Sequence, residues 1–195
     1  MVPNEGTRLK ILAAALDEFS AKGFAGVRVD QIAQAAGVNK AMIYYYFSSK
    51  EDLFNAIFQS ELEGLKRELA LILPGSEAGP PQDQVSAAEA ILAYAGQRKK
   101  FLAILVSAAV LQPEVQPHLF QLLDISAAAG LAAAGASDSD AQQPNQDALL
   151  HELFTGLLPL ASFILLRDGL MDYYGWDEAS LNRVFIQDWL RQHLG

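Results

Sequence analysis

A glycine separates two short helical patterns in the first quarter of the chain, and this arrangement restricts the local fold to a helix–turn–helix. Residues 29–36 repeat apolar side chains at spacings of three and four, which places them on one face of a helix. Gly37 follows, and glycine adopts positive φ in a tight turn without steric cost. Asn39 then offers a side-chain oxygen to cap a second helix over residues 40–47. We therefore predict two short helices joined by a turn at Gly37.

The second helix carries three consecutive tyrosines, which cannot all face one core because successive helical residues point about 100° apart. Ile43 and Phe47 are four residues apart and share a face, so we predict that they pack against the preceding helices. Tyr46 falls near Ile43 and is expected to join this core. Tyr44 and Tyr45 then lie on the outer side of the helix, where they meet solvent or a partner.

This outer side has the chemistry of a DNA-binding surface. Tyrosine hydroxyls donate to phosphates, a small alanine lets a helix approach base edges, and a lysine reaches a base acceptor or a phosphate. A lysine that opens the next helix binds phosphate together with the backbone amides of that helix. The predicted DNA contact residues are Arg28, Asn39, Lys40, Ala41, Tyr44, Tyr45 and Lys50.

Charge is distributed unevenly along the chain, in a way that favours contact with a polyanion through the N-terminal part. The whole chain has a formal net charge of −9, yet residues 1–50 carry six basic and four acidic side chains. The other residues therefore carry a net charge of −11. A mildly basic head on an acidic protein suits a nucleic-acid ligand at that end.

The remainder of the chain also predicts helices, because alanine and leucine dominate and few stretches alternate with a period of two. We expect an all-α protein with a helix–turn–helix head in residues 1–49 and a larger C-terminal helical domain in residues 50–195. A long helix over residues 50–73 connects the two. Segments 74–84 and 135–146 are predicted loops. The other predicted helices cover residues 7–22, 85–97, 99–111, 117–134, 147–167 and 177–194.

Residues 7–58 resemble the DNA-binding head of the TetR (tetracycline-repressor) family of bacterial transcription regulators. The first helix ends in the family's A-x-x-x-F-x-x-x-G-[YF] pattern, and a second shared run continues without gaps to Leu53. The resemblance implies that Tyr44, Tyr45 and Lys50 contact phosphates, while Lys40 and Ala41 face bases. The shared residues are Ala15, Phe19, Gly23, Phe24, Val29, Ile32, Ala33, Ala36, Gly37, Val38, Ile43, Tyr44, Tyr46, Phe47, Ser49, Lys50, Glu51 and Leu53.

Two positions depart from the family pattern. The usual Thr-Thr pair is Val27-Arg28 here, so Arg28 must substitute for a hydroxyl–phosphate contact. The usual histidine is Tyr45, which removes a titratable donor. The resemblance covers about a quarter of the chain, and it implies a regulator, most often a repressor, that binds double-stranded DNA.

The predicted helix over residues 147–167 is apolar all round, and a helix of that kind must be covered on every side. The last predicted helix has a wide apolar face as well. Two such helices from each of two subunits would form a four-helix interface, an arrangement that the family resemblance also implies. A buried monomer core is the alternative. The predicted dimer interface residues are Leu158, Leu165, Leu181, Phe185 and Trp189.

Pro159 lies inside this apolar helix, beside Gly156. Proline removes a backbone donor and clashes with the carbonyl of Thr155, which predicts a kink and a local gap in packing. A gap lined by apolar residues favours a small apolar or amphipathic effector; ordinary core packing is the alternative for each residue. The predicted lining residues are Phe101, Leu105, Phe120, Leu123, Phe154 and Phe163.

Several other classes of protein find no support in the sequence. The chain has no cysteine, which excludes disulfides and thiolate metal sites, and it carries no phosphate-binding or nucleophile motif. His151-Glu152 begins the zinc-protease pattern HExxH, but Thr155 stands where the second histidine is required. The apolar stretch 153–166 is shorter than the ~20 residues of a membrane span. We expect a cytoplasmic protein with no enzyme activity, cofactor, metal or membrane association.

The sequence therefore predicts a DNA-binding transcription regulator, a ligand-responsive repressor that binds a palindromic operator as a homodimer. Two alternatives remain open at this point. One is a helical interaction protein that retains the head without specific operator binding. The other is an enzyme with an unrecognised site. Salt-dependent binding to a palindromic duplex separates the first prediction from both.

Overall fold

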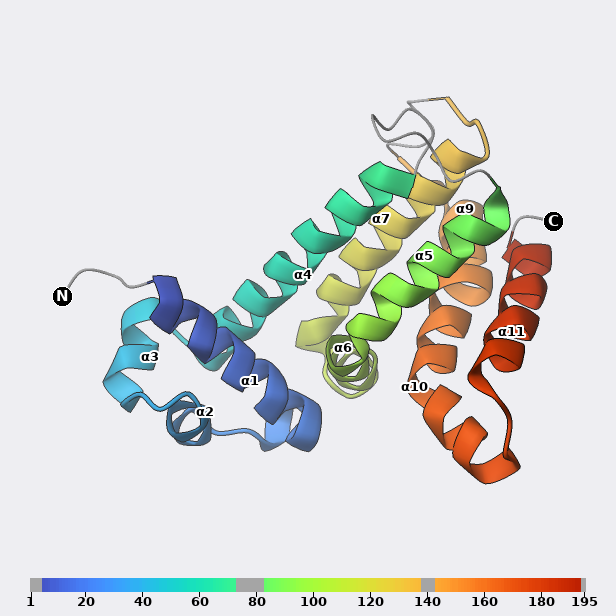
Figure 1. The fold of residues 1–195 in the computed structure, drawn as a ribbon. Helices are drawn as coiled ribbons and strands as arrows, with labels where there is room; N and C mark the ends of the chain where they lie inside the picture. The colour runs from blue at the N-terminus through green and yellow to red at the C-terminus, as the bar shows by residue number, and fades with distance from the viewer. Residues whose placement is uncertain (1–4, 73–82, 138–142, 194–195) are drawn as a thin grey trace.

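The computed structural model describes residues 5–72, 83–137 and 143–193, and these residues fold into helices without any strand (Figure 1). The all-α prediction is confirmed. Most of the two predicted loops, 74–84 and 135–146, lies outside the described residues. The elements are α1 (Glu5–Gly26), α2 (Val29–Ala35), α3 (Lys40–Tyr46), α4 (Lys50–Ile72), α5 (Gln84–Gln97), α6 (Lys99–Leu111), η1 (Pro113–Val115), α7 (Gln116–Ala133), α9 (Gln146–His151), η2 (Glu152–Leu157), α10 (Leu158–Tyr174) and α11 (Glu178–His193).

The helix–turn–helix forms for the local reasons that the sequence predicts. Gly37 has a φ of 66°, which residues with a side chain rarely adopt. The backbone N–H of Met42 donates to the Asn39 side chain at 2.8 Å, so Asn39 caps α3. Ile43 and Phe47 are buried, as predicted, and Tyr46 packs against the same core.

Two hydrophobic cores organise the molecule. The first core runs without a break from the head through α4, α6 and α7 to η2. The second core is built mainly from α5, α10 and α11. Figure 1 shows α4 leading from the head to the C-terminal helices, with α10 and α11 on the side away from the head. The head therefore moves with the first core, because the two share buried side chains.

Contacts between α1 and α6 reinforce this connection. Phe19 of α1 and Ile104 of α6 are both buried in the first core. On the surface, the Lys100 ammonium lies 2.7 Å from the Asp17 carboxylate, although both side chains are exposed and such a pair adds little stability. The apolar contact thus does most to hold the head against the C-terminal helices.

The apolar helix near the C-terminus is longer and less regular than predicted. The sequence predicts a helix over residues 147–167 with a kink at Pro159, whereas α9, η2 and α10 together continue from Gln146 to Tyr174. The middle segment, Glu152–Leu157, is π-helical. A π-helical turn is wider than an α-helical one, and it precedes Pro159, which lacks the N–H for a regular helical bond. The irregularity predicted at Pro159 thus takes the form of a π-helical segment.

By length and composition alone, the 29-residue stretch Gln146–Tyr174 could cross a membrane, because it contains an 18-residue window with a mean hydropathy of 1.8. The packing of this stretch within the protein also accounts for its apolar residues. One side packs into the two cores through residues such as Leu157 and Ile164. The opposite side exposes Phe154 and Leu166, each with more than half of its surface accessible. A single subunit therefore leaves an apolar stripe uncovered along this helix.

Candidate nucleic-acid interface and internal cavity

The outer side of α3 is accessible over most of its length. Tyr44 and Tyr45 expose 49% and 57% of their surface, and Ala41 is exposed on the same helix. Large aromatic side chains at this level of exposure are available to a partner. The predicted separation of the three tyrosines is confirmed, since Tyr46 alone packs against the first core.

Lys40 also lies on the surface, but it has a partner within the head. Its ammonium contacts the Asp30 carboxylate of α2 at 2.9 Å, and both side chains are about half exposed or more. The hydrogen bond to Asp30 raises the pKa of Lys40, so the side chain stays cationic. Solvent screens an exposed pair of this kind, which adds little stability, so a phosphate or base acceptor can replace the carboxylate.

The remaining predicted residues lie at the starts of α2 and α3. Arg28 precedes α2, where its backbone N–H donates to the Gln31 side chain at 2.9 Å, while its own side chain is exposed. The Asn39 oxygen serves as the cap of α3. Arg28, Lys40, Ala41, Tyr44 and Tyr45 are thus all exposed on the head.

Lys50 has a structural role that the sequence does not reveal. Its ammonium donates to the carbonyl oxygens of Phe24 and Val27 at 3.0 and 3.3 Å. It also lies 4.5 Å from the centre of the Phe24 ring, close enough for a cation–π interaction. Lys50 therefore fastens the segment between α1 and α2 to the start of α4.

We expect Lys50→Met to lower the free energy of unfolding by about 1–3 kcal/mol, because two carbonyl groups lose a charged donor while the aliphatic stem is kept. Urea denaturation followed by circular dichroism measures this change. The matched control is Lys66→Met on the same helix, where the ion pair with Glu63 at 2.8 Å is exposed, so the loss should be much smaller than for Lys50→Met. Equal losses in the two variants would show that the carbonyl contacts of Lys50 add no stability.

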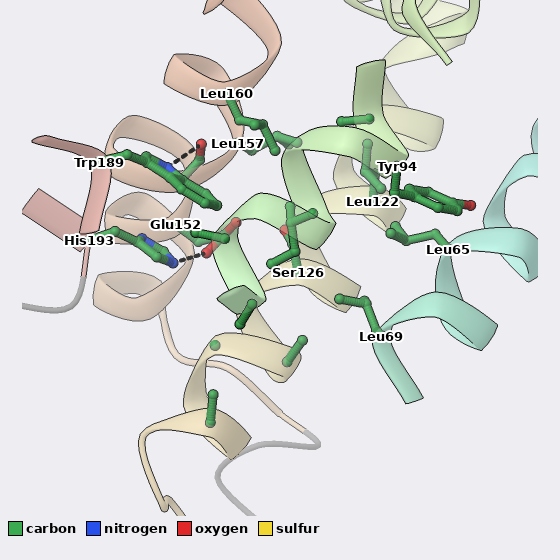
Figure 2. A pocket seen from close by; sticks show the side chains of 18 of the residues that line it. Leu65, Leu69, Tyr94, Leu122, Ser126, Glu152, Leu157, Leu160, Trp189 and His193 are labelled. Atoms are coloured by element: carbon green, nitrogen blue, oxygen red, sulfur yellow. Dashed lines mark hydrogen bonds and ion pairs between the residues drawn. The ribbon is translucent and has the colours of Figure 1, made fainter. Parts of the chain in front are cut away.

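A cavity of about 670 Å³ lies between the two cores, and Figure 2 shows part of its lining. Leu62 and Leu122 belong to the first core, whereas Leu102 and Trp189 belong to the second. Most of the wall is apolar. Its larger apolar residues are Phe58, Leu62, Leu65, Leu69, Ile91, Phe101, Leu102, Leu122, Leu157, Leu160, Trp189 and Leu190.

The cavity is only partly where the sequence predicts it. It reaches Gly156 and Leu160, on either side of Pro159, but Phe101 is the one predicted lining residue that faces it. Leu105 and Leu123 are buried in the first core instead. Phe163 packs in the second core, and Phe120 and Phe154 are exposed. Their side chains point elsewhere because cavity lining depends on how distant helices approach one another.

One group of polar side chains at the cavity wall is internally paired. The Arg98 guanidinium contacts the Glu61 carboxylate at 3.0 Å and donates to the Tyr94 carbonyl oxygen at 3.2 Å. It also lies 3.5 Å from the centre of the Tyr94 ring. In these contacts the charges of Arg98 and Glu61 neutralise each other. The pair connects α4 to the end of α5.

A second polar group surrounds Glu152, whose carboxyl is buried at 6% exposure. His193 of α11 places Nε2 at 3.3 Å from Oε2 of Glu152, and Figure 2 shows the carboxyl between His193 and Ser126. Burial raises the pKa of Glu152 to about 7, while burial and the nearby His151 lower the pKa of His193. Both shifts favour neutral side chains near pH 7.

The hydrogen bonds around His193 assign its neutral tautomer. The Thr155 hydroxyl donates to the His151 carbonyl oxygen at 2.7 Å, so its oxygen is free to accept. Nδ1 of His193 lies 3.1 Å from that oxygen and therefore carries the hydrogen. Nε2 is then an acceptor that faces Glu152. One proton is held between the carboxyl and the imidazole.

Gly156 makes room for the Glu152 carboxyl. A Cβ at position 156 would lie 2.6 Å from Oε1 of Glu152, which is closer than such atoms approach. The Trp189 indole N–H donates to the Gly156 carbonyl oxygen at 3.2 Å, which satisfies a backbone group of the π-helical segment. The sequence contains one signal for this site, a glutamate within an apolar helix, but His193 could not be paired with it by spacing.

None of the five predicted dimer interface residues is exposed in a single subunit; all are buried or partly buried. Trp189 is 8% exposed and lines the cavity, so it faces inward. Phe185 stacks on Phe163 with ring centres 4.0 Å apart, and Leu165 and Leu181 are partly buried against the same second core. Leu158 is partly buried. The most exposed large apolar and aromatic residues of α10 and α11 are instead Leu166, Tyr173, Tyr174 and Val184.

Comparisons with known proteins converge on one family for the head. Residues 11–57 match the family model described as bacterial regulatory proteins, tetR family. The transcriptional regulator RutR of Escherichia coli is 53% identical over 53 residues, and the transcriptional repressor NicS of Pseudomonas putida is 51% identical over 53 residues. Each alignment covers 27% of this chain, and the chain spans 25% of the length of either relative.

Similarity in fold extends over the whole chain. A TetR-like transcriptional regulator from Rhodococcus sp. RHA1 aligns over 100% of both chains, with a TM-score of 0.65 and 23% identity. The fatty acid degradation regulator FadR of Bacillus halodurans aligns over 94% of both chains, with a TM-score of 0.62 and 20% identity. At these identities the match concerns the fold alone. The head is therefore similar in sequence to the tetR family of bacterial regulatory proteins, and the whole chain has the fold of a TetR-like regulator.

Proposed function

We propose that the protein is a transcription regulator, a repressor that binds a palindromic operator as a homodimer and releases it when a small molecule fills the cavity. The observation that carries the proposal is the exposed outer side of α3, where Ala41, Tyr44 and Tyr45 stand clear of the first core. A helix with a small residue and hydroxyl donors on its free face can enter a major groove. The sequence match of the head to RutR and NicS supports the same role.

Dimerisation supplies the second half of the operator contact. Two heads on a two-fold axis read half-sites about one helical turn, ~34 Å, or more apart. The uncovered stripe of α9, η2 and α10, which includes Leu150, Phe154 and Leu166, supplies an apolar surface for the partner. These helices lie away from the head, so their pairing leaves both α3 helices free (Figure 1).

The position of the cavity suggests how a ligand controls the spacing of the heads. The first core carries the head, and the second core carries most of α10 and α11. A ligand between the cores would change their separation and so shift the head relative to the dimer interface. Coupling of this kind is worth ~1–3 kcal/mol in typical systems, and the operator must weaken ligand binding by the same factor.

Selection of bound sequences from a random duplex pool tests the DNA-binding role. We expect enrichment of a palindrome and an affinity for it that falls as salt rises. Ala41→Asp should weaken binding to the selected duplex at least tenfold, because it places a carboxylate against the phosphates without touching the core. Ala70→Asp, on an exposed site near the end of α4, is the matched control and should bind normally.

Two results would contradict the proposal. One is the absence of any enriched sequence, which would favour a helical interaction protein that keeps the head without operator binding. The other is equal DNA affinity for Ala41→Asp and the unmodified protein, which would remove the outer side of α3 from the interface. Measurement by fluorescence anisotropy at several salt concentrations distinguishes specific from purely electrostatic binding.

A further inference from the structure

Glu152 is the one described side chain of the cavity wall whose carboxyl is buried without a permanently charged partner. The charged and titratable groups of the described wall are Glu61, Asp83, Tyr94, Arg98, Glu152 and His193, and burial raises the pKa of Tyr94, which keeps its hydroxyl neutral. Arg98 and Glu61 neutralise each other at 3.0 Å. Asp83 is exposed and accepts the backbone N–H of Ser86 at the start of α5. Among the described residues, the interior of the cavity therefore has an acidic group and no unpaired lysine or arginine to meet an anionic ligand.

The groups that face Glu152 come from three packed elements. His193 approaches from α11, with His151 stacked on it at 5.5 Å between ring centres. From α7, Ser126 lies beside the carboxyl (Figure 2), with its hydroxyl donating to the Leu123 carbonyl oxygen at 3.1 Å, and a Cβ at Gly130 would lie 3.7 Å from Oε2 of Glu152. On the helix of Glu152 itself, Gly156 has no side chain that would collide with the carboxyl. The carboxyl is thus reachable from the cavity and held in place by its surroundings.

We propose that the cavity binds an apolar molecule that carries a protonated amine, with the ammonium on the Glu152 carboxylate and the apolar part along Leu65, Leu69, Ile91 and Leu160. This inference deepens the proposed function, since it names the chemical class of the effector for the same cavity. A carboxylate in an apolar cavity gains most from a cation that brings its own hydrogen-bond donors. An anionic ligand such as a fatty acid would instead meet Glu152 without a counter-charge.

The proton balance of this binding step follows from the Glu152–His193 pair. The free protein holds one proton between the carboxyl and Nε2 of His193. An incoming ammonium donates its hydrogen bonds to the carboxylate, so the proton of the pair leaves to solvent as the ligand binds. No bond within the ligand forms or breaks. Amine binding therefore releases about one proton below neutral pH, where the pair is protonated, and none well above it.

Three ten-carbon probes, n-decylamine, decan-1-ol and decanoate, test the assignment in the full-length protein. We expect the amine to bind roughly ten- to a hundredfold more tightly than the alcohol at pH 8, and decanoate to bind more weakly than either. Amine affinity should fall by up to tenfold per pH unit below pH ~7. Calorimetry in buffers of different ionisation enthalpy measures the proton release directly, without any variant.

Glu152→Gln keeps the shape of the side chain and removes its charge, so it should abolish the amine preference and the proton release. Glu89→Gln, an exposed site on α5 outside the cavity, should change neither. Binding of decan-1-ol by Glu152→Gln shows that the variant cavity is intact. Equal affinity for amine and alcohol, or tighter binding of decanoate, would overturn the proposal; so would amine binding without proton release at pH 6.

A second experiment distinguishes a failure of this inference from a failure of the proposed function. The amine is added to the protein bound to its selected operator. Release of the operator supports both proposals. Tight, Glu152-dependent amine binding with unchanged operator affinity supports the assignment of the ligand class and contradicts the proposed effector role of the cavity.

Discussion

Substituting aspartate for Leu166 is expected to dissociate the dimer and to weaken binding to the palindromic operator by roughly a hundred- to ten-thousandfold, which is the usual gain from joining two binding modules. Leu166 exposes 62% of its surface within one subunit, so the change does not disturb either core. In the dimer the carboxylate would be buried in an apolar interface without a partner. Sedimentation velocity gives the assembly state, and fluorescence anisotropy gives the operator affinity.

Leu111→Asp is the matched control for this experiment. Leu111 is 76% exposed at the end of α6, away from the stripe of α9, η2 and α10. The variant should remain a dimer and bind the operator normally. Phe185→Asp is unsuitable, because Phe185 stacks on Phe163 and Trp189 inside the subunit and its loss would disturb the second core. An unmodified protein that sediments as a monomer at micromolar concentration would show that the stripe is not a dimer interface.

Glu152→Gln is expected to stabilise the protein at pH 8 by up to about 3 kcal/mol and to leave its stability unchanged near pH 4.5. The folded state raises the pKa of Glu152 from 4.5 to about 7, and a rise of that size corresponds to about 3 kcal/mol. The stabilisation from the protonated carboxyl is present below pH 4.5 and is lost as pH rises through 7. Glutamine imitates the protonated form at every pH, including its donation to Nε2 of His193.

Thermal and urea denaturation of the two proteins between pH 4.5 and 8.5 measures this difference. His193 has a lowered pKa, so its own contribution to stability is lost as pH falls, and because it contacts Glu152 the measured difference reports the carboxyl together with its coupling to His193. Glu89→Gln controls for the removal of one negative charge from an acidic protein. A stability difference that stays constant across this range would show that Glu152 does not titrate near neutral pH.

The head illustrates how far local signals in a sequence can define structure. Gly37 turns the chain at positive φ and Asn39 caps α3, and each effect depends on the residue itself and its immediate neighbours. The spacing of Ile43 and Phe47 decides which side of α3 is buried, and hence that Tyr44 and Tyr45 face outward. Such short-range rules also gave the bounds of α6, Lys99–Leu111, which the structure reproduces.

The lining of the cavity and the contacts made by the ends of long side chains depend on tertiary packing instead of local sequence. Lys50 is a plausible phosphate ligand by sequence, yet its ammonium meets the carbonyl oxygens of Phe24 and Val27, whose position depends on how α1 packs on α4. Phe163 is a type of residue that often lines apolar pockets, but its ring stacks on Phe185. Whether an apolar side chain faces a core, a cavity or solvent depends on the relative placement of several helices, which no local pattern encodes.

The sequence by itself determined the helical class, the helix–turn–helix and the outward face of α3, because period, capping and turn chemistry act over a few residues. Only the tertiary structure decided that the head shares its core with α6 and α7, and that a cavity separates this core from the second one. It also brought Glu152 and His193 to 3.3 Å. Contacts between residues far apart in the chain arise from the packing of whole helices, and that packing is a property of all their side chains together.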